Sequence, residues 1–168
     1  MARPRPTRAA APRWSDGQAR RDPLLQRHQR ARRASNFAPY PIRLDGARWP
    51  TSEHYFQAQK FEDPRDREAV RTAKTPSEAA RRGRDRRRKL RRDWESCKEA
   101  VMRKALEAKF RQHPDLAAAL LATGTAKLVE HTDGDAYWGD GGDGSGKNRL
   151  GILLMELRAR LADEAERG

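Results

Sequence analysis

The chain has 168 residues, of which 36% are hydrophobic, so it has the length and apolar content for one domain with a modest core. Its net charge of +13 indicates an anionic partner, but two runs carry more than the whole of that net charge. Residues 1–35 and 81–92 each carry +8, which leaves −3 on the remainder. Such runs are either solvated surface or phosphate contacts, so nucleic acid is an alternative partner.

Simple counts exclude several classes of protein. Cys97 is the single cysteine, so it has no disulfide partner within the chain and a reducing compartment is expected. The N-terminal region lacks the apolar core of a signal peptide, and no stretch approaches the roughly 18 apolar residues of a membrane span. We therefore expect a cytoplasmic protein with no membrane contact and no obligate protein partner.

The first ordered element is expected only after a long basic segment. Residues 1–34 are rich in Arg, Ala and Pro without apolar periodicity, which is typical of a disordered basic extension. Order should begin near Ser35, because residues 35–50 contain two short strands around an Asp45-Gly46 turn. A small hairpin is the prediction for this region.

Helix signals follow the hairpin. Thr51 is a predicted N-cap for a helix that carries "SEHYFQAQKF". The stretch "TPSEAA" at 75–80 is a capping box, with a proline at the first helical position. Another helix should start after Asp93, where an apolar stripe recurs at spacings of three and four, consisting of Cys97, Val101, Ala105 and Ala108, widened by Leu106 and Phe110.

The C-terminal third predicts two further helices. One starts at His113-Pro114 and stops at Gly124, and "AKLVE" at 126–130 is a candidate brief strand. Asn148 is the predicted N-cap of the last helix, whose core-facing stripe is Leu150, Leu153, Leu154, Leu157 and Leu161. Residues 164–168 are assigned to a tail. The predicted fold class is mainly α with a small β component (α+β).

The stretch "YWGDGGDGSGKNRLG" at 137–151 has nearly the spacing of a phosphate-binding P-loop. Asn148, however, stands where a Ser or Thr would bind magnesium, and the preceding "HTDGDAYWGD" is polar rather than a buried strand. An NTPase is therefore excluded. A glycine-rich turn before a helix can still offer backbone amides to a phosphate; the alternative is a flexible Gly/Asp connector.

Five collinear segments resemble the YbiA-like family, also called NADAR. They are "SNF" (35–37), "WPTSEHYFQAQKF" (49–61), "RRDWESCKEAVM" (91–102), "LVEHTDGDAYWGDGGDGSGKNRLG" (128–151) and "LLMELR" (153–158). The resemblance implies a single YbiA-like domain, which we place at 35–163. One departure is "QRARRA" at 29–34, where family members show a strand and an aromatic residue.

The resemblance implies N-glycosidase activity, which needs acidic groups because an oxocarbenium-like transition state places positive charge on the sugar. Glu53 and Asp135 lie in matched motifs, and we expect them to be the acid/base and cation-stabilising pair, without a division of roles. From the residues alone, Glu53 also fits a first-turn acid that favours the helix dipole. Asp135 also fits an ordinary turn residue.

The matched motifs also supply the predicted substrate-binding residues. Trp94 and Trp138 are expected to stack on a base, although Trp94 fits a core anchor equally well. Lys60 is expected to bind the phosphate, with Lys147 as a weaker alternative. Of Gln57 and Gln59, at most one should reach the ligand, because they face different directions on a helix. The remaining predicted substrate-binding residues are Asn36, Gly142, Gly144, Gly146 and Asn148.

The leading hypothesis is an N-glycosidase that hydrolyses the ribosyl bond of phosphorylated ribosylamino-pyrimidines, as the resemblance implies for intermediates of riboflavin synthesis. One alternative is a hydrolase that removes ADP-ribose from guanine in nucleic acid, with the basic runs holding phosphates. Another is a non-catalytic module that binds ADP-ribose or NAD. His54 and the other histidines show no metal-ligand spacing, so no metal or cofactor is expected.

Overall fold

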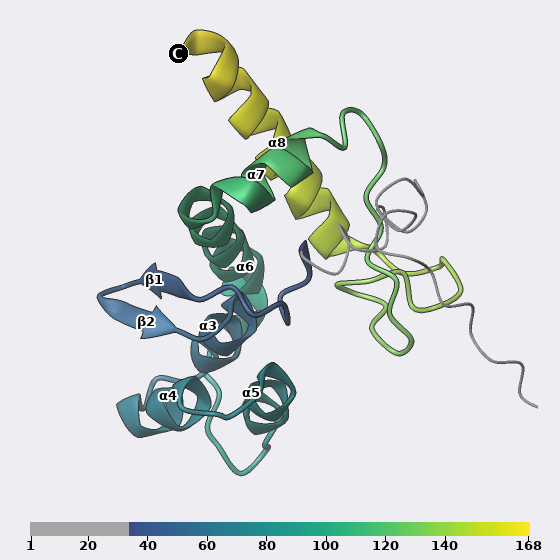
Figure 1. The fold of residues 1–168 in the computed structure, drawn as a ribbon. Helices are drawn as coiled ribbons and strands as arrows, with labels where there is room; N and C mark the ends of the chain where they lie inside the picture. Colours follow the sequence, from purple (N-terminus) through teal and green to yellow (C-terminus); the bar gives the residue numbers. More distant parts are fainter. Residues whose placement is uncertain (1–33) are drawn as a thin grey trace, which may run out of the picture.

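The computed structural model describes residues 34–168, which form six helices and one two-stranded sheet (Figure 1). The elements are β1 (Ile42–Leu44), β2 (Ala47–Trp49), α3 (Ser52–Ala58), α4 (Pro64–Arg71), α5 (Pro76–Gly83), α6 (Trp94–Gln112), α7 (Pro114–Leu121) and α8 (Arg149–Arg167). The prediction of a mainly α domain with a small β component is confirmed. The predicted basic extension falls, apart from Ala34, outside the described residues.

Strands β1 and β2 form the predicted hairpin, in which Ile42 lies opposite Trp49. Asp45 and Gly46 have φ angles of 52° and 74°. Two consecutive positive φ angles are typical of the type I′ turn, whose twist matches that of the flanking strands. The Tyr55 hydroxyl on α3 donates to Asp45 Oδ2 at 2.8 Å. The turn is therefore fastened to the next helix.

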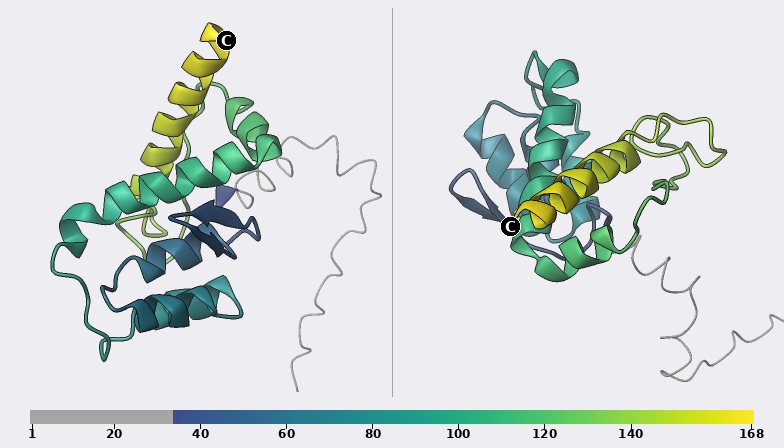
Figure 2. Two further views of the ribbon diagram at one scale, coloured as in Figure 1. Left: turned by 90° about the vertical axis from the view of Figure 1, so that its left-hand side faces the viewer. Right: turned by 90° about the horizontal axis from the view of Figure 1, so that it is seen from above.

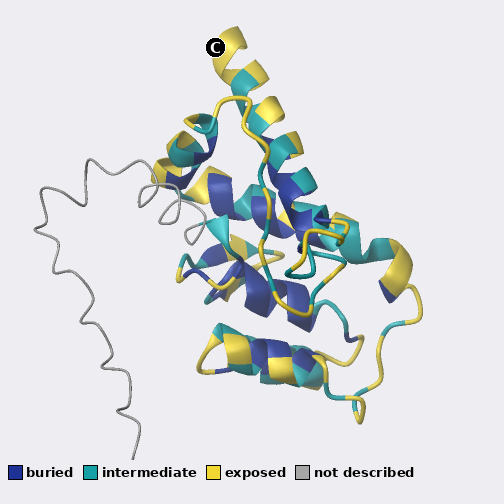
Figure 3. Ribbon diagram, turned by 90° about the vertical axis from the view of Figure 1, so that its right-hand side faces the viewer, coloured by how far each residue is buried: buried dark blue, intermediate teal, exposed yellow. Residues whose placement is uncertain are grey.

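Helix α3 is buried along its whole length and lies between two apolar clusters (Figure 3). Phe56 packs with the cluster formed by α6, α7 and α8. Tyr55 and Ala58 pack with the cluster of the hairpin, α4 and α5. Thr51 caps the helix as predicted, with its hydroxyl accepting from the His54 amide at 3.3 Å. Side chains on a helix enclosed in this way have few rotamers available.

Helices α4 and α5 lie side by side at one end of the molecule, beyond α3 (Figure 1, Figure 2). Helix α4 was not predicted from the sequence, although Asp63 caps it by accepting from the Arg65 amide at 2.8 Å. Only Val70 of α4 is buried, so its apolar periodicity is too weak to recognise. Helix α5 has the predicted Thr75 cap.

The two long helices, α6 and α8, cross each other and enclose the larger cluster together with α7 (Figure 2). The buried stripe of α6 is centred on Met102, Leu106 and Phe110, whereas Cys97 and Val101 are only half-buried. In α8 the predicted leucines are buried, except Leu161, which is half-buried. The predicted tail at 164–168 mostly continues α8. No helix within 34–168 has the length and apolar content needed to cross a membrane.

Of two local predictions near α8, the strand at 126–130 is wrong and the position of Asn148 as N-cap is confirmed. Residues 126–130 form no strand, because no neighbouring strand pairs with them. Instead, the Glu130 amide donates to Asn148 Oδ1 at 2.9 Å, and Asn148 Nδ2 donates to the Leu128 carbonyl at 2.8 Å. Asn148 occupies the cap position of α8 but makes no cap hydrogen bond, since its side chain is used to hold this segment.

Candidate active site

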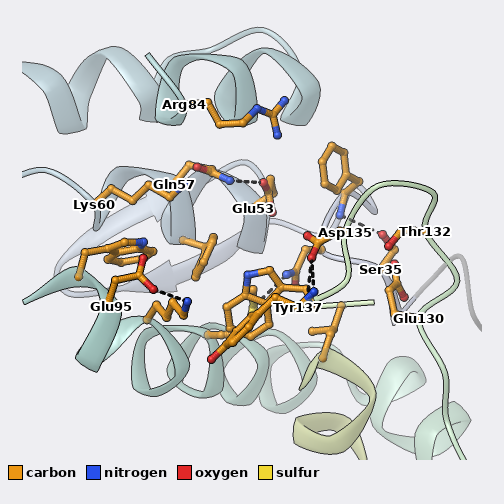
Figure 4. Close-up of a pocket in the computed structure, with 18 of the residues that line it drawn as sticks. Ser35, Glu53, Gln57, Lys60, Arg84, Glu95, Glu130, Thr132, Asp135 and Tyr137 are labelled. Atoms are coloured by element: carbon orange, nitrogen blue, oxygen red, sulfur yellow. Dashed lines mark hydrogen bonds and ion pairs between the residues drawn. The ribbon is translucent and has the colours of Figure 1, made fainter. Parts of the chain in front are cut away.

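A cavity of about 550 Å³ opens beside α3 (Figure 4), a volume usual for a small-molecule site. Its walls come from α3, the start of α6, the residue after α5, the Ser-Asn-Phe segment and the loop before α8. It is lined by Ser35, Asn36, Phe37, Glu53, Phe56, Gln57, Lys60, Arg84, Trp94, Glu95, Lys98, Met102, Glu130, Thr132, Asp133, Asp135, Tyr137, Trp138 and Leu150. Predicted site residues therefore gather from distant parts of the chain.

Glu53 faces the cavity from the first turn of α3 and is only 5% exposed. Burial raises the pKa of this carboxyl, and the negative charge of Asp135 adds to the increase. A hydrogen bond from Gln57, together with the positive charges of Lys60 and Arg84, opposes the effect. The carboxyl is thus a group that holds its proton at higher pH than an exposed glutamate does.

Gln57 holds the Glu53 carboxylate in place. Its Nε2 donates to Glu53 Oε1 at 2.7 Å, one helical turn away. The amide of Gln57 rests against Gly83 in α5, where an added Cβ would lie 2.8 Å from Gln57 Cδ and 2.9 Å from its Cβ. The missing side chain at Gly83 therefore makes room for this arrangement. Gln57 lines the cavity and Gln59 does not, as the spacing of the two glutamines predicted.

Asp135 faces the same cavity from the loop between α7 and α8 (Figure 4). Its Oδ1 accepts from the amides of Tyr137 at 3.0 Å and Trp138 at 2.8 Å. These two hydrogen bonds fix the orientation of the Asp135 carboxylate, and they also position the backbone of Tyr137 and Trp138. The other oxygen, Oδ2, accepts no hydrogen bond within residues 34–168. Asp135 and Glu53 both line this cavity, and the negative charge of Asp135 acts to raise the pKa of Glu53.

The two predicted tryptophans form an aromatic wall with Phe56 between them. Trp94, only 7% exposed, lies with its ring centroid 5.1 Å from that of Phe56, and Trp138 meets Phe56 edge to face at 5.4 Å. Tyr137 packs edge to face on Trp138 at 5.1 Å. Both indoles line the cavity, so this wall offers the flat surface that a base requires.

Lys60 follows α3 and reaches the cavity beside Trp94. Its Nζ donates to the Gly83 carbonyl at 3.4 Å and lies 5.7 Å from the Trp94 ring centroid. Burial lowers the pKa of Lys60, while the charge of Glu53 raises it.

Asn36 lines the cavity, but much of its hydrogen-bonding capacity is used internally. Its Oδ1 accepts from the Ser52 hydroxyl at 3.0 Å, and its Nδ2 donates to the Met102 sulfur at 2.9 Å. Its carbonyl accepts from the Glu53 amide at 3.2 Å. Below it, the buried Lys109 donates to the Ser35 carbonyl at 2.7 Å, and burial lowers the pKa of Lys109 to about 7. These contacts support the floor of the cavity under Glu53.

Four predicted substrate-binding residues are not among those that line the cavity: Gly142, Gly144, Gly146 and Asn148. The three glycine amides all donate to Asp140, either to its carboxylate or to its carbonyl. They are occupied within the loop rather than available to a phosphate. Gly142 and Gly144 each have a φ of 85°, so their glycines serve the path of the loop itself.

Arg84 and Glu130 are among the lining residues that the sequence did not single out. Arg84 is one of nine basic residues in the run 81–92, and nothing in the sequence distinguishes it. Glu130 lies in a matched motif, and burial raises its pKa. Within residues 34–168, no three His, Cys, Asp or Glu side chains are grouped so as to hold a metal ion.

Comparison with known proteins extends the sequence resemblance. The model of the NADAR domain family matches residues 16–162. N-glycosidase YbiA of Escherichia coli is 68% identical over 130 residues, which cover 77% of this chain and 81% of that protein. An N-glycosidase of Nostoc punctiforme is 43% identical over 130 residues, or 76% of this chain and 83% of that one.

Two further proteins are similar to this chain: one is named for a biosynthetic pathway, and the other has a solved structure. A riboflavin biosynthesis protein of Vibrio vulnificus is 47% identical over 131 residues, which cover 78% of this chain and 36% of that protein. The NMR structure of the E. coli protein YbiA superimposes with a TM-score of 0.75 at 65% sequence identity, covering 80% of each chain.

Two acids and two indoles around one cavity, in a chain this similar to named N-glycosidases, define a hydrolase of N-glycosyl compounds. The expected enzyme class is confirmed. Within that class, the chain belongs to the NADAR family.

Proposed function

We propose that this protein hydrolyses the ribosyl N-glycosidic bond of phosphorylated ribosylamino-pyrimidines. The observation that carries the proposal is the convergence of Glu53 and Asp135 on one cavity beside an aromatic wall. The similarity to a riboflavin biosynthesis protein of Vibrio vulnificus supports this substrate class. A base stacked on Trp138 or Trp94 would gain about 1–3 kcal/mol by analogy with single-strand binders.

In the proposed reaction, Glu53 is the general acid. Its raised pKa keeps a proton available, and that proton moves to the leaving nitrogen as the bond between this nitrogen and the sugar C1′ breaks. The electron pair of the bond stays with the nitrogen, so positive charge develops on the sugar ring. The Asp135 carboxylate stabilises this charge and accepts a proton from the water that attacks C1′. The products are the free amine and ribose 5-phosphate.

Release of ribose 5-phosphate from a phosphorylated ribosylamino-pyrimidine is the direct test. We expect Glu53→Gln and Asp135→Asn each to lower kcat/KM about 100-fold or more, in line with the loss of a general acid or base. Glu62→Gln and Asp143→Asn are matched controls, because both carboxylates are exposed and neither lines the cavity. Full activity in both site variants would remove these residues from the chemistry.

The basic run at residues 81–92 favours a second candidate function, which is removal of ADP-ribose from guanine in nucleic acid. In the run, Arg82, Arg87, Arg88 and Arg91 already contact nearby carboxylates. Others, including Arg86 and Arg92, are exposed, so the run can bind phosphates with only part of its charge. The other run, residues 1–35, lies almost wholly outside the described residues.

Binding of an ADP-ribosylated oligonucleotide would then weaken steeply with salt, since each phosphate contact releases counterions. Neutralising exposed arginines of 81–92 should reduce that slope. Turnover that is independent of both salt and these arginines would remove nucleic acid as the substrate. Tight binding of ADP-ribose without turnover of either substrate class would instead favour a non-catalytic module.

A further inference from the structure

The charged side chains at the two ends of the cavity differ in sign, except that Glu95 lies at the cationic end, where it pairs with Lys98. The loop before α8 supplies acidic groups, namely Glu130, Asp133 and Asp135. The opposite wall supplies the cationic groups, namely Lys60 after α3, Arg84 after α5 and Lys98 on α6. Figure 4 shows Glu53 between these two sets, with Lys60 and Arg84 on one side and Asp135 on the other. An anion would therefore be repelled from the loop and attracted to the opposite end.

The cationic end is only partly neutralised. Lys98 pairs with Glu95 at 2.6 Å. Lys60 donates to a backbone carbonyl and not to a carboxylate. The Arg84 guanidinium makes no hydrogen bond or ion pair with any residue in 34–168, whereas Arg82, two positions earlier, is paired with Glu78 at 2.7 Å. Arg84 is thus a cation that the fold directs at the cavity without a protein partner.

Crowding of like charge supports the same conclusion. After burial, the positive charges of Arg84 and Lys98 both act to lower the pKa of Lys60, opposed by Glu53 and Glu95. Because Arg84 and Lys98 each disfavour the charged form of Lys60, a further anion would be attracted to this end of the cavity. A phosphate in this position would relieve the repulsion and accept hydrogen bonds from a planar guanidinium, whose donors match its oxygens.

We infer that Arg84, next to Lys60, forms the binding site for the substrate phosphate, at the end of the cavity opposite the glycine-rich loop. The inference rests on the proposed function, since it assigns one group of the proposed substrate. Phosphate at this end sets the direction of the substrate. The sugar then lies between Glu53 and Asp135, and the base faces the aromatic wall.

The test compares a phosphorylated ribosylamino-pyrimidine with the same compound lacking its phosphate. For Arg84→Gln we expect kcat/KM on the phosphorylated substrate to fall about 10- to 100-fold, as expected for the loss of a charge-assisted contact. On the dephosphorylated substrate it should fall much less, because no phosphate is present to lose the contact and only the effect of the Arg84 charge on Glu53 remains. Arg84→Lys keeps the positive charge but removes the planar guanidinium with its paired donors. Its kcat/KM on the phosphorylated substrate should therefore lie between those of the wild type and Arg84→Gln.

Arg86→Gln is the matched control, since Arg86 is exposed in the same run and does not line the cavity. It should leave both substrates unaffected. Equal losses on the two substrates, or no loss on either, would overturn the inference. An unchanged melting temperature of Arg84→Gln would show that the loss is not due to unfolding.

Calorimetry separates this inference from the proposed function. Ribose 5-phosphate and ADP-ribose should bind the wild-type protein, ribose should bind far more weakly, and Arg84→Gln should weaken only the phosphorylated probes. If the enzyme turns over no ribosylamino-pyrimidine, the proposed function is wrong, yet this pattern would still establish the phosphate site. Tighter binding of ribose 5-phosphate would identify the ligand group as a phosphate monoester, and tighter binding of ADP-ribose would identify it as a diphosphate. Failure of both phosphorylated probes to bind, or equal binding by Arg84→Gln, would overturn the site.

Discussion

The two walls of the cavity are built by different means. Glu53 and Trp94 lie on helices α3 and α6, where backbone hydrogen bonds and packing fix the side chains. Asp135 and Trp138 lie in a loop without regular structure, where side chains bind the backbone amides. Asp140 shows the same pattern, because its carboxylate accepts from the amides of Thr132 and Gly142.

This difference indicates that the walls should fail in different ways. A helical wall tolerates substitutions at exposed positions. Its stability is sensitive to added atoms at positions where its side chains are closely packed. Apart from its packed aromatic side chains, the loop wall depends on single polar side chains, whose loss leaves backbone groups unpaired. Four variants test this contrast, in order of expected effect on the free energy of unfolding.

Asn148→Ala should have the largest effect, because one side chain holds two points of the loop wall. It removes the bonds to the Glu130 amide and the Leu128 carbonyl. Asn148 also has a φ of 48°, which alanine tolerates poorly. We expect a loss of about 2–4 kcal/mol in urea unfolding. Asn148→Gly relieves the backbone strain without restoring the bonds, so it should recover only part of the loss. A full recovery would show that the side-chain bonds contribute little.

Gly83→Ala tests the helical wall. The added Cβ would press on Gln57, which holds the Glu53 carboxylate. Overpacking of this kind costs about 1–3 kcal/mol, and displacement of Gln57 should lower kcat/KM as well. Ser77→Ala, at an exposed position of the same helix, should change neither quantity. The double variant Gly83→Ala with Gln57→Ala should lose less free energy of unfolding than the sum of the losses in the two single variants. Strict additivity would contradict the contact.

The contrast also explains what the sequence could predict. Helix starts at Thr51, Thr75 and Asp93 were correct within a residue or two, because capping and apolar spacing are local signals. Helix α4 was missed because its single buried residue leaves no periodicity.

For the site, the resemblance in sequence motifs named Glu53, Asp135 and the two tryptophans, and all four line one cavity in the structure. The same resemblance named three glycines of the loop, which do not line the cavity because their amides donate to Asp140, a contact that depends on how the loop folds back on itself. Arg84 could not be found, since its distinction from the other basic residues of its run is purely spatial.

Glu99→Gln should have a smaller effect on the loop wall. Glu99 on α6 accepts from the Tyr137 hydroxyl at 2.6 Å and from two nitrogens of Arg149 at 2.7 and 2.6 Å. We expect a loss of about 0.5–1 kcal/mol at neutral pH, because the pair is partly exposed. Glu156→Gln, which breaks a surface pair with Arg103, is the control and should cost less.

The pH dependence of this effect has a definite sign. The Arg149 and Tyr137 contacts lower the pKa of Glu99 to about 2, below the ordinary value of 4.5. A depressed pKa gives stability that is present above pH 4.5 and is lost as the pH falls towards 2. The difference between wild type and Glu99→Gln should therefore shrink over that interval. A constant difference would show that the charge of Glu99 is not involved.

Glu53→Gln should have the smallest effect and the opposite sign. Burial raises the pKa of Glu53, so the native state binds its proton more tightly than the unfolded state does. The stability from this proton is fully present below pH 4.5 and is lost as the pH rises through the folded-state pKa. Glutamine carries no charge, so the variant should melt about 1 °C higher at neutral pH, because roughly 2–4 °C corresponds to 1 kcal/mol and the gain is smaller than the loss in Glu99→Gln. The difference should vanish near pH 4, and Glu62→Gln should show none. If Glu53→Gln instead melts lower at neutral pH, the positive charges of Lys60 and Arg84 outweigh burial and hold Glu53 ionised. Glu53 would then stabilise the sugar cation, and the general acid would have to be another group.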